Sequence, residues 1–250
     1  GQVVLASRDA VDAVGGNVST LEETFVIGGN TVTVRAPGGK KGALPVVYLN
    51  VFQGDGAEVW GRLGELGCAP LALVAVGGIA WERDMTPWPA EPATRNEPPY
   101  EGGAPAYLQK LEDSIVPAAE ERLADGGIAA AWRGIAGYSL AGLFSLWSFW
   151  QTDAFTRAAS ASGSLWYEGW LDYAAGHELA RVPERAYLSL GSKEHRTPNR
   201  LMREVRDASR ATEALLAERG AQTTFELNPG NHFAQTDLRM ARGIAWLCER

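Results

Sequence analysis

The sequence predicts a protein of the α/β class, with a mainly parallel central sheet covered by helices on both faces. The main observation is that, from residue 45 onward, short apolar runs alternate with segments of helical spacing. Such alternation is typical of strand–helix–strand units, whose helices cover the sheet. The second observation is that 250 residues carry no internal repeat and no linker-like tract. This favours a single domain over residues 1–250.

The first predicted elements depart from that alternation. Residues 23–27 and 31–36 are rich in β-branched side chains and flank the turn Gly28-Gly29-Asn30. Two such runs around a short glycine-containing turn are typical of a β-hairpin. We therefore expect an antiparallel N-terminal hairpin ahead of the parallel strands.

Strands and helices are then predicted in alternation. Short apolar runs predict strands at 45–50, 71–78, 130–139, 157–164, 185–192 and 223–230. Apolar residues at three- and four-residue spacing predict helices at 57–66, 105–124, 140–151, 199–220 and 235–249. Pro105 suits a first helical turn, whereas Pro117 should kink or split its helix because proline has no N–H to donate. Gly220 is expected to cap the helix that it ends.

Residues 79–104 interrupt this order with five prolines and two tryptophans, Trp81 and Trp88. A structureless loop of this length in a compact domain is usually functional or disordered, and the tryptophans make disorder less favourable. We expect a loop near the active site, with a packed surface loop as the alternative.

The overall charge excludes several kinds of partner. The net charge is −7, and no block of basic residues exceeds the pair Lys40-Lys41. This argues against binding to nucleic acid or to an anionic membrane surface.

No apolar run approaches the ~20 residues of a membrane span, and residues 1–10 lack the features of a signal peptide. We expect a cytoplasmic protein, or a periplasmic or exported one if a leader was removed.

The two cysteines, Cys68 and Cys248, lie far apart in the sequence. Neither has the spacing of metal ligands, so we predict no metal site. A disulfide between the two stays open.

Ser139 lies in the segment GYSLAG (137–142), where a strand pattern turns into a helix pattern. This is the context of the nucleophile elbow, G-x-S-x-G, found in the α/β-hydrolase fold. Gly137 and Ala141 are small enough for strand and helix to approach each other, although Ala141 replaces the usual glycine. We predict that Ser139 is a nucleophile.

The chain contains only three histidines, so the candidates for a base are few. His232 follows the last predicted strand, and loops at the carboxyl ends of parallel strands converge on one site. His177 lies in a helical or turn region typical of the surface, and His195 follows the strand at 185–192. We predict that His232 is the base.

Glu194 is the first acid after the strand at 185–192. The order Ser139, Glu194, His232 is that of the α/β hydrolases, in which the acid orients the base. We predict Glu194 as the acid, with Asp237 as the fallback. We also predict no organic cofactor, because the hydrolytic mechanism expected for these residues requires none.

Two backbone N–H groups should bind the oxyanion in this fold. One belongs to Leu140, directly after the serine, and the other to Val51 or Phe52 in the loop after the strand at 45–50.

With these residues in place, the chain resembles the enterochelin (siderophore) esterase branch of an esterase family of the α/β hydrolases. The resemblance covers nearly the whole chain from residue 45. It depends on ERDMTPW (82–88), GGAPAYLQKLEDSIVP (102–117), GYSLAGL (137–143), SASGSLWYEGW (160–170), LGSKEHRTPNRLM (190–202) and GNHF (230–233). It implies Ser139 as nucleophile and His232 as base. Because some relatives work with a serine–histidine dyad, the role of Glu194 stays open. The dedicated N-terminal domain of the cytoplasmic enterochelin esterases is expected to be absent.

The resemblance implies hydrolysis of the ester bonds of trilactone catecholate siderophores of the enterobactin type, or of their linear products. The substrate is then a small-molecule ester, with a ferric siderophore as one form of it. Tryptophan and tyrosine rings could pack on catechol rings, and arginines could meet phenolate charge. The residues predicted for this role are Arg83, Trp88, Trp166, Tyr167, Trp170 and Arg196, and Trp81 is a further aromatic candidate.

Two alternatives stay open. The first is another ester chemistry on the same scaffold, by a generic carboxylesterase, a carbohydrate acyl or feruloyl esterase, or a thioesterase. The second is a catalytically inactive hydrolase fold that binds a siderophore or a protein.

Overall fold

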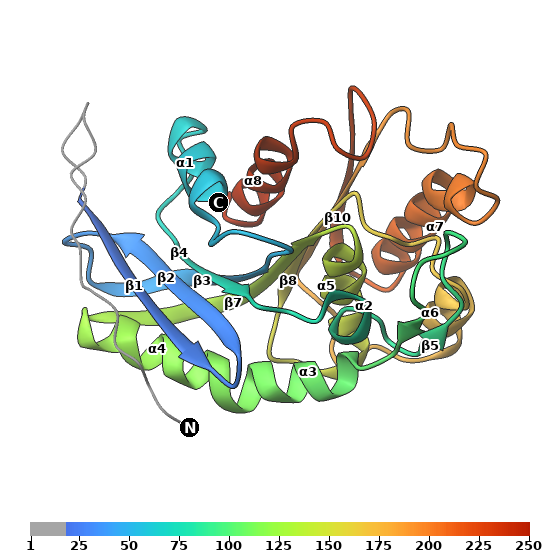
Figure 1. Ribbon diagram of the computed structural model, residues 1–250. Helices are drawn as coiled ribbons and strands as arrows, with labels where there is room; N and C mark the ends of the chain where they lie inside the picture. The colour runs from blue at the N-terminus through green and yellow to red at the C-terminus, as the bar shows by residue number, and fades with distance from the viewer. Residues whose placement is uncertain (1–18) are drawn as a thin grey trace.

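The computed structural model describes residues 19–250. The prediction about a signal peptide concerns residues 1–10, which lie outside the described residues. The predicted α/β class is confirmed. The main strands are β1 (Thr20–Ile27), β2 (Asn30–Pro37), β3 (Gly42–Asn50), β4 (Ala72–Gly77), β7 (Ile128–Tyr138), β8 (Arg157–Ala161), β9 (Arg185–Gly191) and β10 (Gln222–Asn228). They form one sheet in the order β1-β2-β4-β3-β7-β8-β9-β10 (Figure 1).

The pairing of these strands is mainly parallel, as predicted. β3 pairs in parallel with β4 and β7, and the parallel arrangement continues through β8, β9 and β10. β1 and β2 form the expected antiparallel hairpin, whose turn uses Gly28 and Gly29 at φ of 52° and 86°. Strands β7 to β10 are consecutive in space, so the loops at their carboxyl ends lie along one edge.

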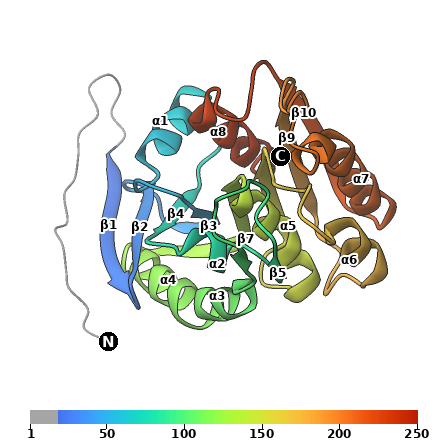
Figure 2. The ribbon, with the colours of Figure 1, turned by 45° about the vertical axis from the view of Figure 1, so that its right-hand side comes forward.

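Helices cover both faces of the sheet (Figure 2). One face carries α1 (Ala57–Glu65) and α8 (Thr236–Leu247), which pack on a small apolar cluster. The opposite face carries the larger cluster, formed with α3 (Ala104–Lys110), α4 (Val116–Asp125), α5 (Leu140–Gln151), α6 (Trp170–Gly176) and α7 (Val205–Glu218). Within residues 19–250, no helix has both the length and the apolar character to cross a bilayer.

Several predicted boundaries differ from the structure for identifiable reasons. The helical segment around Pro117 continues without a break. A π-helical turn at Leu111–Ile115 precedes the proline, and its wider hydrogen-bond spacing accommodates a residue that has no N–H to donate. The strand predicted over 157–164 ends at Ala161, where Ser162 turns the chain with φ of 44°. The helix predicted over 199–220 begins at Val205, after a short 3₁₀ turn. Cys68 and Cys248 are both free thiols.

The segment 79–104 is more ordered than the sequence predicts. It contains the short helix α2 (Trp81–Asp84) and a small antiparallel pair, β5 (Pro89–Ala90) with β6 (Tyr100–Glu101). Thr86 links these pieces, because its hydroxyl accepts a hydrogen bond from the Gly102 N–H and donates one to the Glu82 carbonyl.

The turn from β7 into α5 is packed very closely. All residues of α5 from Leu140 to Trp150 are buried, which is typical of a helix enclosed by a core. A Cβ atom at Gly137 would collide with the Cβ and carbonyl of Ala141, and one at Gly142 would lie 2.7 Å from Ser160 Oγ. The small residues of the segment 137–142 therefore set the distance between strand and helix.

We predict that Gly137→Ala lowers the free energy of unfolding by about 1–3 kcal/mol, because the added methyl overpacks the turn. Urea unfolding followed by tryptophan fluorescence measures this. Gly64→Ala is the matched control, because Gly64 lies on the exposed side of α1, where an added methyl would meet no described atom outside its own helix within 4 Å. This control should not destabilise the protein. Equal stability of the two variants would contradict the close packing at Gly137.

Candidate active site

Ser139 lies between the carboxyl end of β7 and the first turn of α5, as the sequence predicts. Its backbone has φ of 62° and ψ of −124°, a conformation that non-glycine residues rarely adopt. Hydrogen bonds hold it there, since Ser139 N–H donates to Ala161 O at 3.1 Å and Ser139 O accepts from Ser164 N–H at 3.0 Å. Strain of this kind at a polar residue is typical of functional sites.

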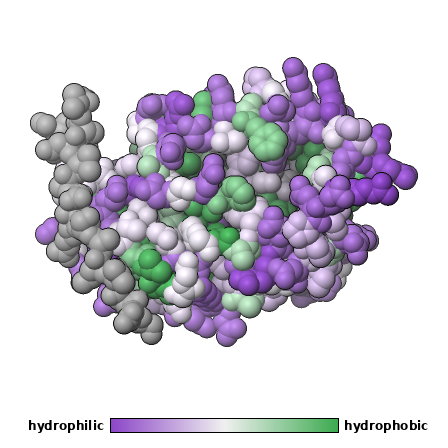
Figure 3. Space-filling model, in the orientation of Figure 1, coloured by the Kyte–Doolittle hydropathy of each residue, from purple (hydrophilic) through white to green (hydrophobic). Residues whose placement is uncertain are grey.

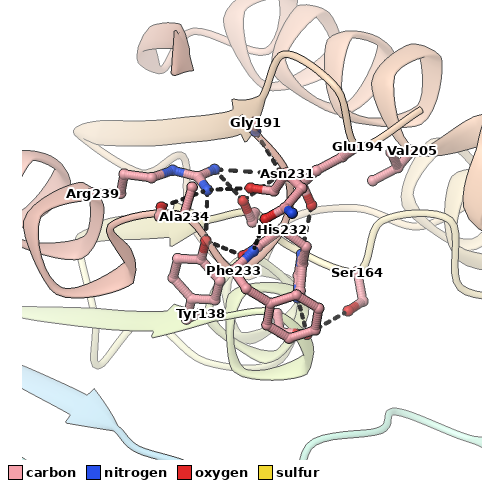
Figure 4. Close-up of polar contacts among 12 residues, drawn as sticks. Tyr138, Ser164, Gly191, Glu194, Val205, Asn231, His232, Phe233, Ala234 and Arg239 are labelled. Carbon is pink, nitrogen blue, oxygen red and sulfur yellow. Dashed lines mark hydrogen bonds and ion pairs between the residues drawn. The ribbon is translucent and has the colours of Figure 1, made fainter. Parts of the chain in front are cut away.

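His232, in the loop between β10 and α8, contacts both other predicted members of the site. Figure 4 shows His232 beside Glu194. Its Nε2 lies 3.1 Å from Ser139 Oγ, and its Nδ1 lies 2.5 Å from Glu194 Oε1. An ionised carboxylate only accepts hydrogen bonds, so Nδ1 carries the proton and Nε2 is free to accept the serine hydroxyl. The Tyr138 hydroxyl donates to the His232 carbonyl at 2.6 Å and fixes the loop.

Glu194 lies in the loop after β9, and its side chain is only 5% exposed. Its Oε2 accepts hydrogen bonds from Ser162 Oγ at 2.6 Å and from Gly191 N–H at 2.5 Å. Burial alone would raise the pKa of Glu194, but hydrogen bonds and charge from His232, with those from Ser162 and Gly191, outweigh it and leave the pKa below its ordinary value. The carboxylate is therefore ionised near neutral pH. Asp237, the fallback acid, instead pairs with Arg62 at 3.0 Å.

Arg239 of α8 is a residue that the sequence reasoning missed. Its side chain is 1% exposed and lies 3.4 Å from Glu194 Oε2. It also donates to the Tyr138 hydroxyl at 2.7 Å and to the Asn231 carbonyl at 3.2 Å, and it contacts the Ser162 hydroxyl. The one feature of the sequence that could have pointed to Arg239 was its place, as a charged residue, on the apolar side of the last predicted helix.

A cleft of about 840 Å³ opens beside Ser139 and His232. Its walls come from the end of β3 and the loop after it, from α1 and α2, and from the loop before α8 and the start of α8. The apolar residues that line it are Leu49, Val51, Phe52, Val59, Trp81, Phe233 and Met240. Phe52 and Phe233 are 68% and 81% exposed. Figure 3 shows patches of apolar surface on a largely hydrophilic face of the molecule. The cleft suits an apolar or aromatic ligand.

The predicted oxyanion donors are reduced by the structure from three residues to two. Val51 is excluded because its N–H donates to Val76 O at 2.9 Å. The N–H of Phe52 has no acceptor among the residues that the structure describes. Leu140 is the first residue of α5, so its N–H is one of the unpaired donors of a helix N-terminus.

Two of the predicted substrate contacts belong to the core instead. Trp170 is 0% exposed, and its indole N–H donates to Thr212 Oγ1 at 3.0 Å. Tyr167 is 2% exposed, and its hydroxyl donates to the Trp88 carbonyl at 2.5 Å. Direct packing of either ring on a ligand is therefore wrong, because no surface of the ring is available.

The other predicted substrate residues do not line the cleft either. Trp88 and Trp166 are half-buried, and the Trp88 indole donates to Glu168 O at 2.8 Å. Arg83 is exposed and pairs with Asp84 at 2.9 Å, and Arg196 is exposed in the loop after β9. Trp88 and Trp166 instead pack against tyrosine rings, in contacts that join the segment 79–104 to residues 166–173. Trp81 is the aromatic candidate that does line the cleft.

A carboxylate, an imidazole and a serine hydroxyl are thus hydrogen-bonded in sequence at the carboxyl edge of a mainly parallel sheet. This order of groups can move a proton from the hydroxyl to the imidazole while the carboxylate stabilises the resulting charge. Fold and site together define an enzyme of the α/β-hydrolase class.

The chain belongs to the esterase family, whose sequence profile, described as "Putative esterase", matches residues 31–236. It is accordingly a carboxylic ester hydrolase. Among curated proteins it is similar to the uncharacterized protein YbbA of Bacillus subtilis (strain 168), with 25% identity over 192 residues, which are 72% of this chain and 73% of YbbA.

Solved structures of similar fold include several siderophore hydrolases. The enterobactin and salmochelin hydrolase IroE is 22% identical, with a TM-score of 0.66 over 99% of this chain and 95% of IroE. The siderophore hydrolase EstA of Aspergillus nidulans is 17% identical, with a TM-score of 0.71 over 97% of this chain and 98% of EstA. An IroE-like serine hydrolase of Shewanella oneidensis is 16% identical, with a TM-score of 0.70 over 93% and 80% of the two chains. The fold that the resemblance implied is therefore confirmed.

We predict that Glu194→Gln lowers the free energy of unfolding at pH 7 by about 2 kcal/mol, because the neutral amide cannot replace a carboxylate facing Arg239. Because the folded-state pKa of Glu194 is lowered, its ionised form stabilises the protein above its ordinary pKa. That contribution is lost as the pH falls through the folded-state value.

The difference between wild type and variant should therefore shrink as the pH is lowered toward 3, which urea unfolding at a series of pH values measures. Glu65→Gln, at an exposed position paired with Arg62, is the control and should change stability by less than about 0.5 kcal/mol. A Glu194→Gln difference independent of pH would count against an ionised Glu194.

Proposed function

We propose that the protein is a serine ester hydrolase in which Ser139 is the nucleophile, His232 the general base and Glu194 the acid that orients it. The observation that carries the proposal is the unbroken hydrogen-bond chain from Glu194 through His232 to Ser139 Oγ. Support comes from the positive φ of Ser139 and from the cleft that opens beside its hydroxyl.

The proposed reaction has two stages. His232 Nε2 takes the hydroxyl proton as Ser139 Oγ bonds to the ester carbonyl carbon, and the oxyanion accepts hydrogen bonds from the N–H groups of Phe52 and Leu140. The carbon–oxygen bond to the alcohol then breaks, and the alcohol leaves with the proton held by His232. Water, deprotonated by the same imidazole, attacks the acyl-enzyme, releases the acid and regenerates Ser139.

We further propose that the substrate is an ester of a trilactone or catecholate siderophore. The fold likeness to proteins named as enterobactin, salmochelin and siderophore hydrolases supports this substrate class. The aromatic side chains of Phe52, Trp81 and Phe233 around the cleft could pack on catechol rings. Such cleavage would serve iron acquisition.

A second candidate is a carboxylesterase for simple uncharged esters. Among the described residues that line the cleft there is no lysine or arginine, whereas Glu58 and Asp237 are present. A lining of this charge does not favour an anionic ligand.

We predict that Ser139→Ala lowers ester turnover by about 10⁴- to 10⁶-fold while the fold is retained. Chromatographic product analysis on iron-free and ferric enterobactin-type trilactone, beside feruloyl, thioester and simple acyl esters, measures the activity. A fluorophosphonate probe, whose fluoride is displaced by the serine oxygen, should label wild type and not Ser139→Ala. Turnover of simple esters without trilactone cleavage would leave the second candidate, and hydrolysis that survives in Ser139→Ala would end the proposal.

We predict that Phe233→Ala raises KM for an aromatic ester by about 3- to 10-fold, because a ring contact is lost at the cleft. Its effect on an acetyl ester should be small, and so should its effect on stability, because Phe233 is 81% exposed. Leu227→Ala, on an exposed residue of β10 outside the cleft lining, is the control for removing surface apolar area. Identical KM values for Phe233→Ala and wild type would show that the ring does not contact the substrate.

A further inference from the structure

Arg35 of β2 is a buried cation that the site described above does not use. Its side chain is 2% exposed, and its Nε donates to Glu22 Oε2 of β1 at 3.1 Å. The rest of its guanidinium binds Asp55. Nη1 donates to the Asp55 carbonyl at 2.5 Å, and Nη2 lies 3.0 Å from Asp55 Oδ2. Arg35 thus holds both the main chain and the side chain of one loop residue.

Asp55 belongs to the loop 51–56, which connects β3 to α1 and lines the cleft. Its other carboxylate oxygen, Oδ1, accepts a hydrogen bond from Ala57 N–H at 3.0 Å, in the first turn of α1. The next residue, Gly56, has φ of 80°, and a Cβ atom there would lie 2.9 Å from the Cβ of Ala75 in β4. The end of the loop is therefore pressed onto the sheet where Arg35 holds it.

The beginning of the loop has its own anchor, the hydrogen bond from Val51 N–H to Val76 O at 2.9 Å. Between the two anchors lie Phe52, Gln53 and Gly54, all exposed and all lining the cleft. The N–H of Phe52 has no acceptor within the described part of the chain. Its direction depends on how firmly both ends of this short segment are fixed.

An arginine is an unusual choice for a purely stabilising role at this position. Burying a charge costs free energy, and well-packed apolar residues often stabilise a protein equally well. What a guanidinium adds is a rigid, planar set of donors that can bind a carbonyl and a carboxylate together in fixed geometry. The two contacts with Asp55 use this property.

We infer that Arg35 is a positioning residue, which holds the loop 51–56 through Asp55 so that the Phe52 N–H stays directed at the reacting carbonyl oxygen. The inference rests on the proposed function, because it assigns the Phe52 N–H to the oxyanion. It adds that the N-terminal hairpin contributes to the active site from the far edge of the sheet, without touching the substrate.

The test compares Arg35→Met with Arg122→Met. Arg122 of α4 is the matched control, because it pairs with Glu23, the neighbour of Glu22 on β1, at 3.1 Å. Adjacent residues of a strand point to opposite faces, so this second ion pair lies away from the cleft. Both variants lose an arginine that pairs with a glutamate of β1, and both should lose stability.

Arg35→Met should lower kcat by about 10- to 100-fold, because a displacement near 1 Å of a reacting group has effects of this size. KM for a small acetyl ester should change by less than about 3-fold, because such an ester does not depend on packing against the Phe52 ring of the loosened loop. Arg35→Lys should recover part of kcat, since one ammonium can reach Asp55 without the double contact. Asp55→Ala should resemble Arg35→Met, and the double variant should be no worse than either single one. Arg122→Met should keep wild-type kcat.

Hydrogen exchange over residues 51–57 tests the anchor without reference to any substrate. Exchange there should be faster in Arg35→Met and unchanged in Arg122→Met. Wild-type kcat in Arg35→Met, or equal kcat loss in both variants, would overturn the inference while Ser139-dependent hydrolysis stands. If the wild-type protein neither hydrolyses esters nor reacts with a fluorophosphonate, the proposed function has failed. The exchange experiment still tests the anchor then, because unchanged exchange in Arg35→Met would show that Arg35 does not hold the loop.

Discussion

The candidate active site depends on one buried carboxylate and the groups that neutralise it. Glu194 is bound by Ser162 after β8, by Gly191 at the end of β9, by His232 after β10 and by Arg239 of α8. A buried charge without such partners would cost several kcal/mol, so each of these segments is constrained by the same group. The position of His232 relative to Ser139 follows from that constraint.

The strand order explains how so few residues can hold so many segments. Strands β7, β8, β9 and β10 are neighbours and parallel, so their carboxyl ends open at one edge. Ser139, Ser162, Glu194 and His232 follow these four strands in that spatial order. Arg239 comes from α8, which packs on one face of the sheet. It links the loops of this edge by donating hydrogen bonds to the Tyr138 hydroxyl and to the Asn231 carbonyl.

The parts of the site that could be predicted from the sequence are those that topology alone positions. Ser139, Glu194 and His232 each follow a strand, and parallel strands bring the residues after them together without further information. Ser162 was missed because the strand predicted over 157–164 includes it, whereas β8 ends at Ala161. Arg239 was missed because it lies on a helix, so its contact with Glu194 is set by side-chain packing and not by strand order. The expectation for Trp170 failed for a related reason: the turn after β8 leads into α6, which the sequence did not predict and which buries the indole against α7.

The distribution of arginines bears on the kind of ligand that fits the cleft. Arg35 and Arg239 are buried, and each is already matched by carboxylates. Arg83 and Arg196, expected from the sequence to meet an anionic substrate, are exposed and outside the cleft lining. Among the described residues, the lining of the cleft includes the aromatic side chains of Phe52, Trp81 and Phe233 but no lysine or arginine. In the proposed hydrolase, a ligand would therefore be held in the cleft through its shape and apolar surface and not through pairing with an arginine or lysine of the lining.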